Sequence, residues 1–102
     1  MYHDKTLAND IRNQLQSKRN TIQWTQFRSC QAYIGELTVV TIGNDDYFVH
    51  PFRSYETVVA YVDFDTNVLY EVGKYSQTTS KQVTQYYNQV ANANERIFHS
   101  RR

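Results

Sequence analysis

The chain of 102 residues has little of the residue types that cross-link or interrupt a fold: one cysteine, one proline and three glycines. Because Cys30 has no second cysteine, the sequence excludes an internal disulfide framework and the paired spacing of a zinc site. A single free cysteine is most often a small buried hydrophobe, and we interpret Cys30 in that way.

Long hydrophobic runs are also missing. No apolar stretch approaches the roughly 20 residues of a membrane-spanning helix, and the N-terminal segment MYHDKTLAND has no hydrophobic signal core. A hydrophobic content of 40% is sufficient for one core in a chain of this length. We therefore predict a single domain over residues 1–102 that is cytoplasmic and has no membrane partner.

Recognisable metal and phosphate motifs are absent from the sequence. The three histidines, His3, His50 and His99, are far apart and have no carboxylate or histidine neighbour at the spacing of helical metal ligands. Each glycine stands alone at the end of a predicted strand, so there is no glycine-rich phosphate loop. We predict no metal and no cofactor.

Two residue pairs remain as catalytic alternatives. Cys30 and His50 would form a nucleophile and its base if the fold brought them together. Asp63 and Asp65 would offer two carboxylates for acid and base roles, but aspartates at this place are better explained by a turn, since their side chains bond nearby backbone. We predict that the protein is not an enzyme.

Residues 4–19 have the pattern of an amphipathic helix. Leu7, Ile11 and Leu15 recur at four-residue spacing, and Asp4 can accept hydrogen bonds from the free amides of the first turn. The next segment, 20–33, alternates like a short strand at Ile22 and Trp24 but also fits an irregular connection.

Four strands are predicted from the β-branched and alternating segments 37–42, 46–52, 54–64 and 67–72. Gly43 to Asp45 form the first reversal, and Asp65 to Asn67 form the turn of the last hairpin. Pro51 cannot donate a ladder hydrogen bond, so its strand should lie at an edge or break there.

A second helix is predicted from about Ser80 to the high nineties. Thr79 and Gln82 have the spacing of a capping box, and an apolar stripe continues to Ile97. The order of elements predicts an α+β fold, in which a four-stranded antiparallel meander packs with an N-terminal and a C-terminal helix. Ile97 and Phe98 lie so near the end that they could pack on a second copy, which makes a homodimer possible.

A Ser-Tyr-x-Thr strand motif and a Tyr-Ser-x-Thr-Thr-Ser-Lys helix-start motif lie in the middle of the chain. The matched positions are Ser54, Tyr55, Thr57, Val59, Ala60, Asp63, Tyr75, Ser76, Thr78, Thr79, Ser80 and Lys81. With them, the middle third of the chain resembles small, mostly uncharacterised proteins of phages and other mobile elements of Gram-positive bacteria. That family often has a histidine where this chain has Gln82, so no histidine role is carried over.

Charge and tyrosine are distributed unevenly. The net charge is +3 over residues 1–30, −5 over residues 31–75 and +3 over residues 76–102, and nine tyrosines are present. Opposite charges on helices and sheet can neutralise one another, or they can give a binding face of one sign. Tyrosine suits both recognition surfaces and cross-strand packing.

Two functions follow from these features and the resemblance. The absence of a complete catalytic set predicts a non-enzymatic protein, and an acidic, tyrosine-bearing sheet fits a stoichiometric inhibitor of a host protein. The resemblance to mobile-element proteins implies an accessory protein with an anti-defence, anti-CRISPR-like role, in which the host protein is a nucleic-acid-binding defence protein. The residues expected to bind that partner are Asp45, Asp46, Tyr47, Glu56, Tyr61, Asp63 and Asp65. The alternative is a nucleic-acid-binding regulatory module that uses Lys18, Arg19, Arg28, Arg96, Arg101 and Arg102.

Overall fold

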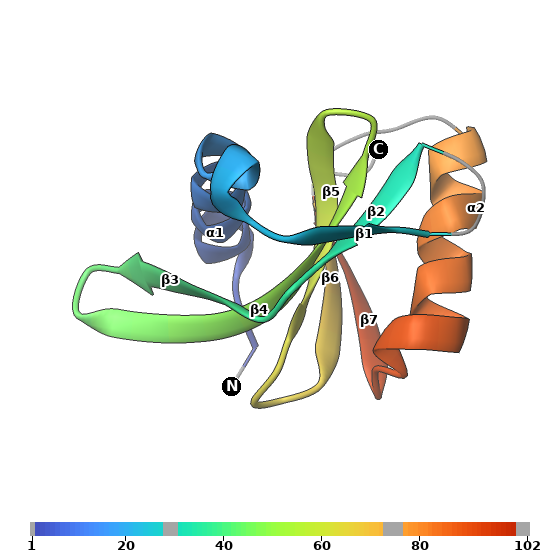
Figure 1. Cartoon of the computed structure of the whole chain (residues 1–102). Coiled ribbons are helices and arrows are strands. Elements are labelled where there is room, and N and C mark those ends of the chain that lie inside the picture. The colour runs from blue at the N-terminus through green and yellow to red at the C-terminus, as the bar shows by residue number, and fades with distance from the viewer. Residues whose placement is uncertain (1, 28–30, 73–76, 100–102) are drawn as a thin grey trace.

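The computed structural model describes residues 2–27, 31–72 and 77–99. These residues form one mixed sheet of seven strands with a helix on each face (Figure 1). The strands are β1 (Trp24–Gln26), β2 (Ala32–Gly35), β3 (Thr38–Ile42), β4 (Asp45–Ser54), β5 (Thr57–Asp63), β6 (Val68–Val72) and β7 (Glu95–His99). The helices are α1 (Lys5–Ser17) and α2 (Gln77–Tyr86), with the short helical turns η1 (Arg19–Thr21) and η2 (Tyr87–Ala91).

The prediction of a four-stranded meander is wrong, although the α+β class holds. The strand order is β1-β2-β4-β5-β6-β7, and β3 pairs with the first half of β4. The four predicted strands correspond to β3–β6, and β1, β2 and β7 extend the sheet beyond them. All pairs are antiparallel except β6 with β7, which are parallel because α2 carries the chain back across the sheet.

The end of the second helix was also predicted wrongly. α2 gives way to the π-helical turn η2, and Asn92 adopts a left-handed backbone with φ of 50°, which ends the helix. Ile97 and Phe98 therefore lie on β7. The proposed capping box is wrong as well, because the described helix already includes Gln77 and so places Thr79 inside it.

Pro51 lies inside the sheet, not at an edge. β4 pairs with β3 as far as Val49 and with β2 from Phe52, so Pro51 stands where β4 exchanges one partner for the other. A residue without an N–H is tolerated there, because the ladder on that side is already interrupted. A Cβ on Gly35 would lie 2.6 Å from the Pro51 ring, which explains the glycine opposite it.

Each helix buries a different face of the sheet. On one face, Ala8, Ile11 and Leu15 of α1 pack against a cluster that includes Val40 and Val49. On the other face, Val83 and Tyr86 of α2 pack on Phe52, Val59, Ala60, Val62 and Leu69. The separation follows from the alternation of side chains along each strand, which is interrupted at Val59, where the register of β4 and β5 shifts.

Polar side chains of α1 also bond to backbone at free strand edges. Gln16 donates to the Glu56 carbonyl at 2.7 Å and accepts from the Val58 amide at 2.7 Å, as a neighbouring strand would. Gln14 and Lys18 donate to β3 carbonyls at 2.9 and 3.1 Å. These contacts occupy edge groups that otherwise invite pairing with another chain.

The hairpin between β5 and β6 is confirmed. Asp63 pairs with Val68, and its carboxylate accepts from the amides of Asp65 and Thr66 at 2.8 and 3.3 Å. Asn67 closes the turn with φ of 57°, a conformation that asparagine tolerates better than most residues.

Several predictions fall on residues outside the described part of the chain: those for Cys30, Arg28, Gly73, Tyr75, Ser76, Arg101 and Arg102. Among the helices that the structure describes, none has the length and apolar character required to cross a bilayer.

Candidate functional site

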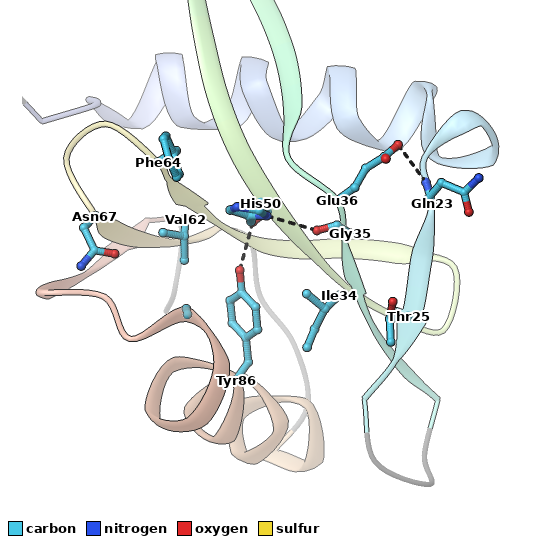
Figure 2. Close-up of a pocket in the computed structure, with 11 residues that line it drawn as sticks. Gln23, Thr25, Ile34, Gly35, Glu36, His50, Val62, Phe64, Asn67 and Tyr86 are labelled. Carbon is cyan, nitrogen blue, oxygen red and sulfur yellow. Dashed lines mark hydrogen bonds between the residues drawn. The ribbon is translucent and has the colours of Figure 1, made fainter.

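A cavity of about 580 Å³ lies between the sheet and the end of α2 (Figure 2). Its floor comes from β2, β4 and β5, and one wall comes from β1. Its lining residues are Gln23, Thr25, Ile34, Gly35, Glu36, His50, Val62, Phe64, Asn67, Tyr86 and Ala91. This volume falls in the range of small-ligand sites.

His50 lies at the centre of the cavity floor (Figure 2). Its Nδ1 is 3.4 Å from the Gly35 carbonyl oxygen. A carbonyl only accepts, so in the tautomer that carries its proton on Nδ1 this contact is a hydrogen bond and Nε2 is an acceptor. The Phe64 ring meets the imidazole edge to face at a centroid distance of 6.1 Å.

Tyr86 reaches the cavity from α2. Its hydroxyl donates to the His50 carbonyl at 3.0 Å, and its ring stacks on Phe52 at 4.7 Å. Burial raises the pKa of the Tyr86 phenol well above its ordinary value, so the hydroxyl keeps its proton. Tyr86 therefore positions α2 on the sheet and offers only its lone pairs to a ligand.

Glu36 and Asn67 lie at opposite ends of the cavity (Figure 2). One Glu36 carboxylate oxygen accepts from the Gln23 amide at 3.2 Å. Asn67 donates its side-chain amide to the Asn92 carbonyl at 2.9 Å, which leaves the amide oxygen facing the cavity. Both side chains thus retain acceptor capacity.

An open apolar surface lies beside the cavity on the hairpin of β3 and β4, which extends away from α2 in Figure 1. Val39 and Phe48 are register partners and are 43% and 41% exposed. The Phe64 amide donates to the Phe48 carbonyl, which places Phe64, 59% exposed, next in the same row. We call the hairpin of β3 and β4 the arm, and we call the row of Val39, Phe48 and Phe64 the arm face.

The arm face is open because α2 covers only part of the sheet. The opposite side of the same hairpin presents Val40 and Val49, which are fully buried against the cluster of α1. The α2 cluster instead begins further along β4, at Phe52. One hairpin therefore has a covered side and an uncovered side, both apolar.

The other face of the sheet holds a closed polar network around His3. The His3 ring is 2.8 Å from the Asp63 carboxylate through Nε2 and 2.7 Å from the Tyr61 hydroxyl through Nδ1. Its backbone amide donates to the Tyr70 hydroxyl at 3.0 Å, and its ring stacks on Tyr70 at 4.2 Å. Tyr47 meets the same imidazole edge to face at 5.2 Å.

The pKa shifts in this network indicate a structural role. Burial by itself raises the pKa of Asp63, but hydrogen bonds from His3 and from the amides of Asp65 and Thr66 outweigh it, so the pKa lies below its ordinary value. Burial raises the pKa of Tyr61, which keeps its hydroxyl protonated. A phenol so held is a hydrogen-bond partner and not an activated nucleophile.

The predicted partner-binding residues do not form one surface. Tyr61 and Asp63 are 0% and 5% exposed, so their assignment to a surface is corrected to the core. Tyr47 is half-buried against His3, on the side of the arm opposite to Phe48.

The remaining acidic residues lie at three different turns. Asp45 and Asp46 stand at the tip of the arm, Asp65 in the turn between β5 and β6, and Glu56 in the turn between β4 and β5. Of these, Asp46 lies two residues from Phe48 on the side of the arm face, where it accepts from the Thr41 hydroxyl at 2.7 Å. The acidic character is local to each turn.

The predicted nucleic-acid residues that the structure describes are engaged in internal contacts. Arg96 binds the fully buried Glu71 carboxylate through Nε at 2.8 Å and stacks on Tyr87. Lys18 donates to a β3 carbonyl, and Arg19 lies 3.4 Å from a Glu56 carboxylate oxygen. They do not gather into one basic surface.

Sequence reasoning missed the cavity and the His3 network. The partners of these histidines are not their neighbours in the sequence. His3 contacts Asp63, which is 60 positions away, and His50 is hydrogen-bonded to Gly35 and Tyr86. The exposed side of the arm carried a usable signal, since Val39 and Phe48 break the polar alternation expected of a solvated strand face.

Within the described residues, no group of three or more histidine, cysteine, aspartate or glutamate side chains has the arrangement of a metal site. Comparison with known families shows that a family of unknown function (DUF8033) matches residues 9–101, so the chain belongs to that family. Comparisons with curated proteins and with solved structures gave no match.

Proposed function

We propose that this DUF8033 family member is a non-enzymatic accessory protein of a phage or other mobile element, which binds a host protein stoichiometrically through the arm face. Its place of action is the cytoplasm of the host, and its effect is inhibition of a defence protein. The observation that carries the proposal is the row of Val39, Phe48 and Phe64, exposed beside a cavity. Contiguous exposed apolar side chains mark interaction surfaces.

The charge around the arm face favours a basic partner. Residues 36–50 include Glu36, Asp45 and Asp46 and no lysine or arginine. Asp65 follows Phe64 directly in sequence and is exposed. An apolar centre with an acidic rim is complementary to a partner that offers apolar side chains within a basic surface, such as a nucleic-acid-binding protein.

The hydrogen bonds of the polar residues support binding without turnover. The Tyr86 hydroxyl is bonded to a backbone carbonyl, and His50 points its Nδ1 at another. Among the described residues, neither side chain is hydrogen-bonded to a carboxylate or to a base. The resemblance of segment 54–81 to mobile-element proteins adds the biological setting.

Affinity capture from a lysate of a Gram-positive host tests the proposal. The baits are the parent protein, Phe48→Asp, and Tyr55→Asp as a matched control, because Tyr55 is 65% exposed in the turn between β4 and β5. We expect a nuclease-resistant protein partner that the parent and Tyr55→Asp retain and Phe48→Asp loses. Equal capture by all three baits would contradict the proposal.

Charge reversal tests the acidic rim. Asp45→Lys with Asp46→Lys should weaken binding of the recovered partner by tenfold or more at low salt, while Asp10→Lys, on the exposed side of α1, should not. Recovery of nucleic acid that is lost at high salt would instead support the nucleic-acid-binding alternative.

Light scattering of the purified protein tests whether a second copy of the chain, and not a host protein, occupies the arm face. We expect a monomer, because the row should be open to the host partner. A dimer that Phe48→Asp converts to a monomer would assign the arm face to self-association.

A further inference from the structure

We infer that the cavity beside the arm face is a binding site for a cation with an apolar stem, of the guanidinium or ammonium class. The inference rests on the proposed function in one respect, since an arginine or lysine side chain of the partner is one source of such a cation. A free small amine or amidine is the other source. The lining residues leave hydrogen-bonding capacity unused.

Most of the unused polar atoms of the lining are acceptors, and the Gln23 side-chain amide and the Thr25 hydroxyl can donate as well. His50 directs Nδ1 at the Gly35 carbonyl, and in the tautomer that donates there Nε2 is free to accept. Asn67 has committed its amide nitrogen to Asn92, and Tyr86 has committed its proton to His50. Glu36 has a second carboxylate oxygen beyond the one that accepts from Gln23. A ligand that binds near either end of the cavity must donate hydrogen bonds to the acceptors there.

The charge of the lining has one sign. Glu36 is the one formally charged side chain among the described residues around the cavity, and lysine and arginine do not occur among them. An anionic ligand would be repelled by the carboxylate and by the acceptor atoms. A guanidinium carries five N–H donors and an ammonium carries three, without any acceptor of their own.

The shape of the cavity suits a stem as well as a charged head. Ile34, Val62 and Ala91 provide aliphatic walls, and Phe64 offers an aromatic ring at the side that joins the arm face. Cations stack favourably on such rings, and the methylene stem of arginine or lysine buries well along aliphatic walls. The cavity thus takes a cation whose stem enters from the direction of the arm face.

Titration calorimetry with N-acetyl-arginine amide tests the inference on the isolated protein. The matched neutral probe is N-acetyl-citrulline amide, which keeps the shape of the side chain and removes its charge. We expect the arginine probe to bind at least tenfold more tightly than the citrulline probe. Equal binding of the two probes, or binding of neither, would overturn the inference.

Two substitutions locate the binding in the cavity. Glu36→Gln keeps an oxygen for the Gln23 amide and removes the charge, and it should weaken the arginine probe about tenfold. Thr25→Trp should abolish binding by filling the mouth from an exposed position of β1. Glu56→Gln, on the turn between β4 and β5 and outside the lining, is the matched control and should not change the affinity. An unchanged affinity in Glu36→Gln and Thr25→Trp would overturn the site.

Competition separates the two sources of the cation and keeps the inference distinct from the proposed function. If an excess of the arginine probe displaces the captured partner, the cation is a partner side chain. If the probe binds the cavity but leaves the partner in place, the site serves a free small cation. Should the protein capture no partner while the probe still binds, the proposed function fails and the cation site stands.

Discussion

The two faces of the sheet use similar residues in opposite ways. On the face that α1 covers, His3, Tyr61 and Asp63 are buried and bonded to one another. On the face that α2 covers in part, His50, Tyr86 and Glu36 surround a cavity and retain unused acceptors. The difference teaches that a histidine near a carboxylate or phenol signals function only where its neighbours leave something unsatisfied.

A large effect is expected from removing one member of the closed face. Asp63→Ala removes the partner of His3 and the acceptor of two turn amides, and we expect the free energy of unfolding to fall by about 3 kcal/mol. The control Asp65→Ala removes an exposed carboxylate from the same turn and should cost under about 0.5 kcal/mol. Urea unfolding of both variants measures the difference, and equal midpoints would show that the network contributes nothing.

The predictable part of the fold was local. Segments with β-branched runs bounded by turn residues, from β3 to β6, were predicted close to their bounds, and α1 was predicted from its apolar spacing and from Asp4, whose carboxylate accepts from the Leu7 amide. These signals lie within a few neighbouring residues, so a sequence reader can find them.

Two strands, β2 and β7, were missed, and β1 was one of two alternatives for segment 20–33. All three depend on distant partners. β1 and β2 are three and four residues long, and β7 is held by a parallel pairing with β6 across the whole of α2. Such strands are stable only because they pair with other strands of the sheet. The local pattern around Ile97 fitted a helix equally well. The candidate site was beyond prediction for the same reason, since its lining comes from four strands, two helical segments and the connections between elements.

A smaller effect is expected from removing one hydroxyl of the closed face. Tyr61→Phe keeps the buried ring and takes away the hydrogen bond to His3 Nδ1, which should cost about 1 kcal/mol. Tyr55→Phe, which removes the hydroxyl of an exposed tyrosine, is the matched control and should be neutral. Thermal unfolding compares the two, and a Tyr61→Phe variant as stable as the parent would place that hydroxyl outside the energetics of the fold.

The pH dependence of stability sharpens the comparison further. Burial lowers the pKa of His99, so the unfolded chain takes up a proton more readily, and stability should decline as pH falls below the unfolded value of about 6.5. The pKa of Asp63 is also lowered, so its contribution is complete above the unfolded value of about 4 and is lost as pH falls through the folded value.

Urea unfolding between pH 7 and pH 3 should therefore show two declines. His99→Gln should flatten the upper decline, and Asp63→Asn should flatten the lower one. A stability that rises on acidification from pH 7 would contradict the assigned directions.

The smallest effect on stability should come from the open face. Phe48→Asp replaces a side chain that is already 41% exposed, so we expect a change within about 0.5 kcal/mol. Val49→Asp, the next residue, points to the covered side of the arm and should severely destabilise the protein, because it buries an unpaired charge. Similar melting temperatures for the two variants would show that the sides of the arm have been assigned wrongly.

The most direct test of the account is a titration of the captured partner against the parent protein, Phe48→Asp and Tyr61→Phe. We expect Phe48→Asp to raise the dissociation constant at least tenfold without a loss of stability, because it places a charge in the centre of the arm face. Tyr61→Phe should lower stability and leave the dissociation constant unchanged. An affinity that falls with Tyr61→Phe and survives Phe48→Asp would contradict the assignment of binding to the open face and of stability to the closed one.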